Sequence, residues 1–125
     1  MTEKKRILLV DDEATITRTL RLYLEGTGKY EVRTQNHAIE AVATARAFKP
    51  HIILLDIVMP DIDGAEVAEK MKSEPALKDV PIVFLTALVR PGEVAASGSD
   101  IGGQPFIAKP LDPDRIVECI EKYTQ

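Results

Sequence analysis

Short runs of consecutive apolar residues alternate along this chain with segments of helical periodicity. Three apolar runs, at residues 7–10, 51–55 and 81–85, have the pattern of strands that are covered on both faces. Residues 30–34 alternate between apolar and polar side chains, as an edge strand does, and residues 105–108 predict a shorter strand at the opposite edge. The pattern therefore predicts five strands, three central and two at the edges.

Helical periodicity fills the intervals between these strands. Each predicted helix has one apolar stripe that would pack against the sheet. The stripes are Ile16, Leu20, Tyr23 and Leu24; Ile39, Val42, Ala43 and Ala47; Val67 and Met71; and Ile116, Ile120 and Tyr123. Strands that alternate with helices predict an α/β fold with a parallel, doubly wound sheet. Residues 90–105 contain four of the seven glycines, so a helix there is expected to be short and weak.

Length, cysteine content and charge narrow the class of protein. A chain of 125 residues has the usual size of one domain with a core of its own. Its single cysteine, Cys119, excludes an internal disulfide, and no apolar run approaches the roughly 20 residues that cross a bilayer. We therefore expect a cytoplasmic protein without a membrane segment. The net charge of −4 argues against direct nucleic-acid binding.

Polar residues that could bind a ligand or take part in a reaction lie where the predicted strands end. Asp11 and Asp12 follow the first strand, Asp56 follows the third, Thr86 the fourth and Lys109 the fifth. Doubly wound folds bind their ligands beyond the carboxyl ends of the strands. All five side chains are therefore expected on one rim of the sheet.

These residue types together favour phosphoryl transfer to an aspartate. Three converging carboxylates repel one another unless a cation lies among them. Mg²⁺ suits this position because it prefers oxygen ligands and is usually held by one or two carboxylates together with phosphate oxygens. Lys109 adds a positive charge for a phosphoryl oxygen, and the Thr86 hydroxyl can donate a hydrogen bond to another.

The ordered set of motifs resembles the receiver domains of two-component response regulators, stand-alone chemotaxis regulators among them. The similarity covers residues 5–123 and rests on residues 7–13, residues 54–64, Thr86-Ala87 and Lys109-Pro110. It implies one receiver domain over residues 1–125 with a flavodoxin-like (βα)5 fold and the strand order 2-1-3-4-5.

The resemblance also implies the roles of the residues at the rim. Asp56 would be the phosphoacceptor, and Asp11, Asp12 and Asp56 would hold Mg²⁺, or Mn²⁺ in its place, with the backbone carbonyl of Val58. Lys109 would contact the phosphoryl group.

A switch and its partners follow from the same resemblance. Thr86 would engage the phosphoryl group while the ring of Phe106 swings inward, changing the surface around residues 86–110 for a downstream protein. The phosphoryl donor would be a sensor histidine kinase or a histidine phosphotransfer protein. A switch of this kind is not an enzyme with a separate substrate. The sequence leaves the kinase, the output and the oligomeric state open.

Each motif has a simpler structural interpretation when it is taken alone. The acidic triplet at residues 11–13 could favour a helix N-terminus, Thr86 could be a helix N-cap, and Phe106 could be an edge-strand core residue. Cys119 borders an apolar stripe and is expected to be a packing residue. The coincidence of the acidic triplet with Asp56 favours the functional interpretation for the rim.

Competing functions fit the sequence less well. A flavodoxin-like electron carrier needs a phosphate cradle after the first strand, where the acidic triplet at residues 11–13 would repel a flavin phosphate. An aspartate-nucleophile phosphatase typically has a second acid two residues after the nucleophile, where this chain has Val58. The remaining alternative is a receiver-like binding scaffold that does not use phosphorylation.

Overall fold

The fold is built on a parallel sheet that five strands form in the predicted order. The computed structural model of the protein describes residues 4–57, 64–86, 100–101, 104–108 and 111–124. The parallel strands are β1 (Lys5–Val10), β2 (Tyr30–Gln35), β3 (Ile52–Asp56), β4 (Ile82–Thr86) and β6 (Gln104–Ala108). They lie in the order β2-β1-β3-β4-β6, which confirms the predicted order 2-1-3-4-5. A two-residue strand that the sequence did not predict, β5 (Asp100–Ile101), pairs antiparallel with β6 at the edge.

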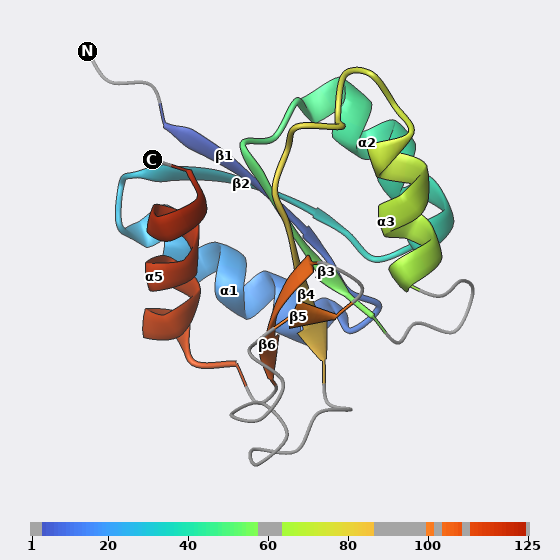
Figure 1. The fold of residues 1–125 in the computed structure, drawn as a ribbon. Coiled ribbons are helices and arrows are strands. Elements are labelled where there is room, and N and C mark those ends of the chain that lie inside the picture. Colours follow the sequence, from blue (N-terminus) through green and yellow to red (C-terminus); the bar gives the residue numbers. More distant parts are fainter. Residues whose placement is uncertain (1–3, 58–63, 87–99, 102–103, 109–110, 125) are drawn as a thin grey trace.

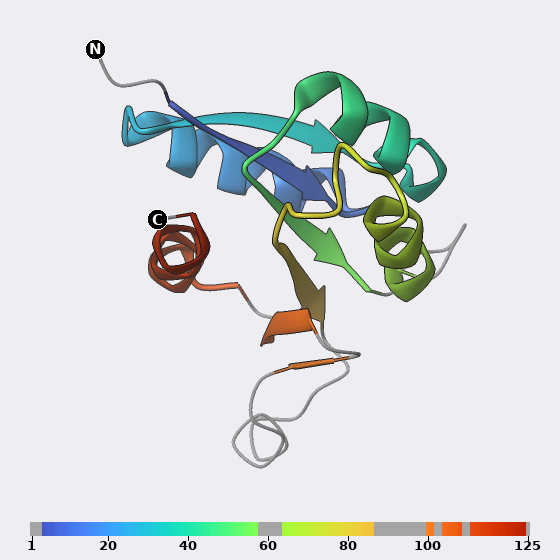
Figure 2. The same ribbon diagram turned by 45° about the horizontal axis from the view of Figure 1, so that its top comes forward.

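The central strands are apolar because both of their faces are covered. Every residue of β3 and β4 is buried, and so are the last four of β1, whereas β2 alternates between buried and exposed positions in its first four residues. The arrows in Figure 2 show β1 to β4 running in the same direction, so their carboxyl ends meet at one edge of the sheet.

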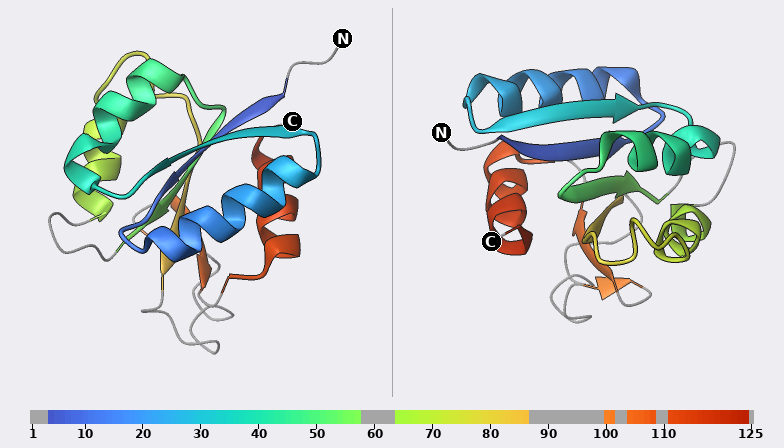
Figure 3. Two further views of the ribbon diagram at one scale, coloured as in Figure 1. Left: turned by 180° about the vertical axis from the view of Figure 1, so that it is seen from behind. Right: turned by 90° about the horizontal axis from the view of Figure 1, so that it is seen from above.

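The helices cover the two faces of the sheet in pairs. They are α1 (Ala14–Gly26), α2 (Ala41–Phe48), α3 (Gly64–Lys72) and α5 (Pro113–Tyr123), with a 3₁₀ turn, η1 (Ala38–Glu40), before α2. α2 and α3 lie on one face, and α1 and α5 lie on the other (Figures 1 and 3). None of the helices within the described ranges has the length and apolar character needed to cross a membrane.

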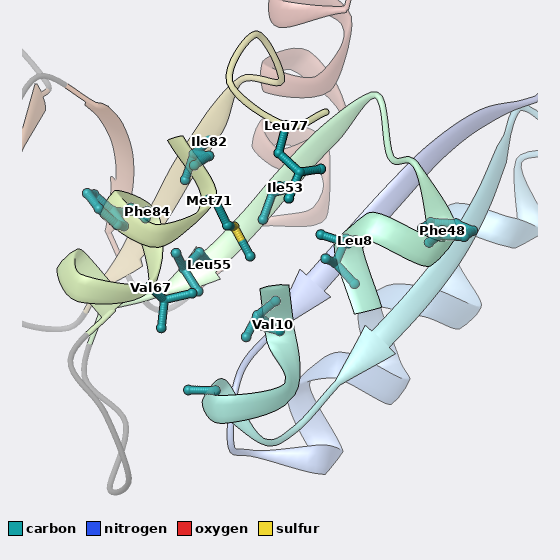
Figure 4. Packing of buried hydrophobic residues seen from close by; sticks show 14 of the residues in the cluster. Leu8, Val10, Phe48, Ile53, Leu55, Val67, Met71, Leu77, Ile82 and Phe84 are labelled. Carbon is teal, nitrogen blue, oxygen red and sulfur yellow. The ribbon is translucent and has the colours of Figure 1, made fainter. Parts of the chain in front are cut away.

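Each pair of helices packs on its own hydrophobic cluster. On the α2–α3 face, Met71 and Val67 of α3 pack against alternate residues of the strands, among them Ile53 and Leu55 (Figure 4). On the other face, Leu20 and Leu24 of α1 and Ile116 and Ile120 of α5 pack on the intervening strand positions. The predicted stripes of the first, third and last helices are therefore largely confirmed.

The predicted stripe of the second helix is wrong. Ile39 is 71% exposed and Ala43 and Ala47 are exposed as well, while Val42 is only partly buried. The buried positions are Ala38, Ala41, Ala45 and Phe48. These positions also recur with helical spacing, and they bury the large ring of Phe48, which the predicted stripe of Ile39 and small residues leaves out.

One residue of the predicted α1 stripe also lies elsewhere. Tyr23 is 42% exposed, and its hydroxyl donates a hydrogen bond to Asp114 Oδ1 of α5 at 3.0 Å. This hydrogen bond raises the pKa of Tyr23. Tyr23 therefore links the two helices of this face at their surface.

The predicted weak helix between residues 90 and 105 falls almost wholly outside the described residues.

Candidate metal centre

Parallel pairing brings the polar ends of β1, β3 and β4 to one edge of the sheet. Val10 of β1 pairs with Leu55 of β3, and Asp11 and Asp56 are the residues that come next. Thr86 is the last residue of β4 and is fully buried. The strand register alone therefore places these side chains at neighbouring positions.

Asp11, Asp12 and Asp56 form a cluster that we call the acidic trio. One carboxylate oxygen from each residue lies within 4.8 Å of the others. Asp11 is completely buried and Asp56 is 3% exposed, whereas Asp12 is exposed to solvent. The sequence prediction that these three residues converge is therefore confirmed.

The backbone and a neighbouring side chain hold Asp11 in place. Its N–H donates to the carbonyl of Gln35 at 3.2 Å, its Oδ1 accepts from the N–H of Glu13 at 3.0 Å, and its carbonyl accepts from Asn36 Nδ2 at 2.7 Å. The Glu13 contact lies just before α1, which begins without a side-chain hydrogen bond at its N-cap, so the simpler interpretation of the acidic triplet as a helix cap is not confirmed. The turn contact is compatible with a role in metal binding, because a carboxylate has two oxygens and the hydrogen bond from Glu13 is made to Oδ1.

Main-chain contacts fix the position of Asp56. The next residue, Ile57, donates its N–H to the carbonyl of Leu85 at 3.1 Å and accepts from the N–H of Gly64 at 2.9 Å. A Cβ on Gly64 would lie 2.5 Å from Ile57 Cα and closer still to the carbonyl oxygen of Asp56. The start of α3 is thus packed directly on the backbone that carries Asp56.

The donor set of the acidic trio fits Mg²⁺. Two buried carboxylates and one at the surface are costly to keep charged together without a cation. Mg²⁺ binds oxygen at about 2.0–2.1 Å and keeps several waters. The spacing within 4.8 Å suits an ion that contacts some of the carboxylates directly and reaches the others through water. Mn²⁺ accepts the same oxygen ligands.

Thr86 and Phe106 lie on adjacent strands. Phe106 pairs with Phe84, and Thr86 lies two residues beyond Phe84 on the same face of β4. The Phe106 ring is only 7% exposed and belongs to the hydrophobic cluster on the α2–α3 face. Its interpretation as a core residue is therefore confirmed, although the short strand β5 and not β6 lies at the edge of the sheet, and its role in switching stays a prediction.

Two predicted site residues, Val58 and Lys109, lie outside the described residues, so their roles stay predictions.

The interpretation of Cys119 as a packing residue agrees with its environment. Cys119 is partly buried in the cluster under α5, and burial raises its pKa to about 11. Its thiol is therefore protonated and unreactive at neutral pH.

Sequence reasoning missed Asn36, which contacts the backbone of the acidic trio. Asn36 follows β2, whose carboxyl end carries none of the five predicted rim residues. The same argument that identified the other strand ends could have found it, because β2 is parallel to β1 and ends at the same edge.

Comparison with known proteins agrees with this geometry. The family model described as the response regulator receiver domain matches residues 7–121. The chain is 40% identical over 116 residues to the probable transcriptional regulator ycf27 of Pyropia yezoensis, covering 91% of this chain and 45% of that protein. It is 30% identical over 119 residues to the polar-differentiation response regulator DivK of Brucella anthropi, covering 95% of each.

Solved structures share the fold as well as the sequence. The chemotaxis protein CheY4 of Vibrio cholerae superposes with a TM-score of 0.81 at 27% identity, over 97% of this chain and 99% of that one. Several of the curated relatives are longer, and this chain spans 45% of the ycf27 proteins and 50% of the response regulator Rre1 of Synechocystis.

Proposed function

Because this chain belongs to the family of response regulator receiver domains, we propose that it is a signalling switch that accepts a phosphoryl group on Asp56. The observation that carries the proposal is the acidic trio, in which one exposed and two buried carboxylates converge at the carboxyl edge of the sheet. A site of this kind needs a cation and offers a nucleophilic oxygen beside it.

The proposed reaction is direct transfer from a phosphohistidine to Asp56. A carboxylate oxygen of Asp56 attacks the phosphorus, the P–O bond forms as the P–N bond breaks, and the imidazole leaves with the electron pair and takes up a proton. Bound Mg²⁺ supplies positive charge that stabilises the phosphoryl oxygens. Hydrolysis by water later returns the Asp56 carboxylate and releases inorganic phosphate, so no separate substrate is turned over.

Other residues at the rim would support this transfer. Asp11 and Asp12 hold the metal with Asp56, and the backbone carbonyl of Val58 is proposed as a further ligand. Lys109 is proposed to neutralise one phosphoryl oxygen, and the Thr86 hydroxyl to donate a hydrogen bond to another. The main-chain contacts of Ile57 support the arrangement, because they fix the strand end that carries the nucleophile.

Phosphorylation is proposed to change the surface around residues 86–110 for a downstream protein. Movement of Thr86 toward the phosphoryl group would change the balance between arrangements of Thr86 and Phe106 that exist beforehand. The buried position of Phe106 beside β4 supports the inward arrangement as one of the two. The donor would be a sensor histidine kinase or a histidine phosphotransfer protein, and the compartment the cytoplasm.

Mass spectrometry of the intact protein tests the proposal. After incubation with acetyl phosphate and Mg²⁺, the protein should gain one phosphoryl group, and a chelator should prevent the gain. Failure to gain a phosphoryl group from acetyl phosphate or from any phosphorylated donor protein would favour the alternative, a receiver-like scaffold that does not use phosphorylation.

The switch can be tested separately with beryllofluoride, which mimics a phosphoryl group on an aspartate. Hydrogen exchange across residues 90–105 is expected to change when beryllofluoride and Mg²⁺ are added, because this segment adjoins the proposed switch residues. An identical exchange pattern with and without the mimic would count against a switch on this face, while leaving phosphorylation itself unaffected.

A further inference from the structure

Asn36 joins three segments of the chain at the edge where the acidic trio lies. It follows the last residue of β2, and its Nδ2 donates to the carbonyl oxygen of Asp11 at 2.7 Å and to Thr17 Oγ1 at 3.0 Å. A backbone carbonyl can only accept, so the amide nitrogen of Asn36, and not its oxygen, must face Asp11. The side chain therefore has one orientation that satisfies this contact.

The Asp11 carbonyl belongs to the peptide group that connects Asp11 to Asp12. Because a peptide group is planar, a hydrogen bond to its oxygen also fixes the direction of the Asp12 N–H and the position of the Asp12 Cα. The side chain of Asp11 is held by burial and by the N–H of Glu13, whereas Asp12 is exposed. The backbone is thus the means by which the protein can keep the Asp12 carboxylate near its two partners.

The second contact of Asn36 anchors the amide itself. Thr17 is 2% exposed and lies in α1, where its hydroxyl donates to the carbonyl of Ala14 at 3.1 Å and accepts from Asn36. Asn36 is therefore held against α1, whose position is fixed by the hydrophobic cluster beneath it. The Asp11–Asp12 peptide is tied through Asn36 to a rigid element.

We propose that Asn36 is a positioning residue for the metal site, which holds the Asp11–Asp12 peptide so that the Asp12 carboxylate is preorganised for a divalent cation. The inference rests on the proposed function, because it assigns Asn36 a role toward the Mg²⁺ that this function requires. Mutation of residues that orient metal ligands without touching the metal typically costs about 10–100-fold in metal affinity.

Metal titration of three single variants and one double variant tests this inference. In Asn36→Ala, the Mg²⁺ dissociation constant should rise about 10-fold, and the loss of its two hydrogen bonds should also lower the urea midpoint of the metal-free protein. Gln35→Ala is the matched control, because its side chain donates to Thr44 Oγ1 and accepts from the His37 N–H in the same loop, whereas the carbonyl that accepts from the Asp11 N–H belongs to the main chain and is kept. This control should bind Mg²⁺ with wild-type affinity.

Thr17→Val provides the second, milder variant. This substitution keeps the size of the side chain and leaves the hydrogen bond from Asn36 to the Asp11 carbonyl possible. It removes the Thr17 hydroxyl, which accepts the second hydrogen bond from Asn36. Its loss of affinity should be smaller than that of Asn36→Ala, and the double variant should lose no more than Asn36→Ala alone. Additive losses would indicate that Thr17 acts on the site independently and would overturn the proposed linkage.

A metal-free measurement gives a readout that a general loss of stability would not produce. The amide resonances of Asp12 and Glu13 should shift in Asn36→Ala but not in Gln35→Ala, because only the former releases the Asp11–Asp12 peptide. Equal Mg²⁺ affinity in Asn36→Ala and wild type would overturn the inference and leave the proposed function standing. Absence of Mg²⁺ binding by the wild type would overturn both.

Discussion

Gly64 is packed so closely against the backbone of Asp56 and Ile57 that a side chain cannot fit there. The atoms that an added Cβ would meet belong to the main chain of β3 and of the residue after it, so they cannot move aside cheaply. We expect Gly64→Ala to lower the free energy of unfolding by about 2 kcal/mol and to slow phosphoryl uptake at Asp56. Urea denaturation and the rate of phosphorylation measure these effects.

Gly26→Ala is the matched control for this substitution. Gly26 is the last residue of α1, and a Cβ added there would meet nothing within 4 Å. Because alanine favours helix more than glycine does, this variant should be unchanged or more stable by up to about 1 kcal/mol. Similar stabilities of the two variants would show that the close contact at Gly64 has been overinterpreted.

Asp12 offers a test of the charge balance in the acidic trio. Removing its carboxylate in Asp12→Ala should weaken Mg²⁺ binding at least about 10-fold, because the ion loses one of three anionic ligands. Without metal, the same change should leave the protein as stable or more so, since one like charge is removed from the cluster. The opposite effects can be measured as urea midpoints with and without Mg²⁺.

The exposed Glu31 on β2 gives the control for this experiment, because Glu31→Ala removes the same charge away from the trio. It should leave the effect of Mg²⁺ on the midpoint unchanged. If Asp12→Ala bound Mg²⁺ as tightly as the wild type, Asp12 would have to be removed from the metal site.

The sequence predicted the acidic trio because strand ends are readable from apolar runs. Asp11 and Asp56 each end such a run, and the parallel pairing of β1 with β3 brings these two strand ends together. The place of Asn36 after β2 could have been read in the same way, but its partner could not, since a hydrogen bond to the Asp11 backbone carbonyl leaves no residue pattern. The contact of Gly64 depends on how α3 approaches β3, which the periodicity of α3 does not specify.

At the scale of elements, the end of α5 is joined to the sheet by a buried tyrosine. Tyr30, at the start of β2, is 1% exposed and donates its hydroxyl proton to Glu121 Oε2 of α5 at 2.6 Å, while Lys5 Nζ lies 3.5 Å from the same oxygen. The hydrogen bond from Tyr30 lowers the pKa of Glu121, and burial raises the pKa of Tyr30. The arrangement stabilises the ionised form of Glu121.

Stability should therefore depend on pH through this contact. Because the pKa of Glu121 is lower in the folded state than its ordinary value of 4.5, the contribution is complete above that value and is lost as the pH falls through the folded pKa. Tyr30→Phe should cost about 1 kcal/mol at pH 7 and less at pH 3. Urea denaturation at both pH values measures the difference, and a cost independent of pH would contradict the assignment.

The wrong prediction of the buried face of α2 shows that the sequence pattern does not always determine which side of a helix packs on the sheet. The apolar residues between 38 and 48 allow two stripes, one through Ile39 and one through Phe48. The fold buries the second, which contains the large aromatic ring, and Lys49 ends the helix in a left-handed conformation with φ of 54°. Because both stripes have helical spacing, helical periodicity alone could not predict the choice. The two-residue strand β5 is too short to leave any pattern.

At the scale of the whole molecule, two hydrophobic clusters on opposite faces hold a parallel sheet whose carboxyl edge carries the site. The alternation of apolar runs with amphipathic helices is sufficient to predict this architecture, because a parallel sheet must be covered on both faces. The fold confines the polar residues of three strands to one edge, which is why few sequence positions suffice to identify the site.

Asp56 is proposed to be the residue that carries the phosphoryl group. Acyl phosphates are reduced by borohydride whereas free carboxylates are not, so reduction of the protein treated with acetyl phosphate and Mg²⁺ marks the modified aspartate. Peptide mapping by mass spectrometry should find the reduced residue at position 56 alone, with no reduced residue in Asp56→Asn. Modification at Asp11 or Asp12, or uptake that survives in Asp56→Asn, would contradict this account.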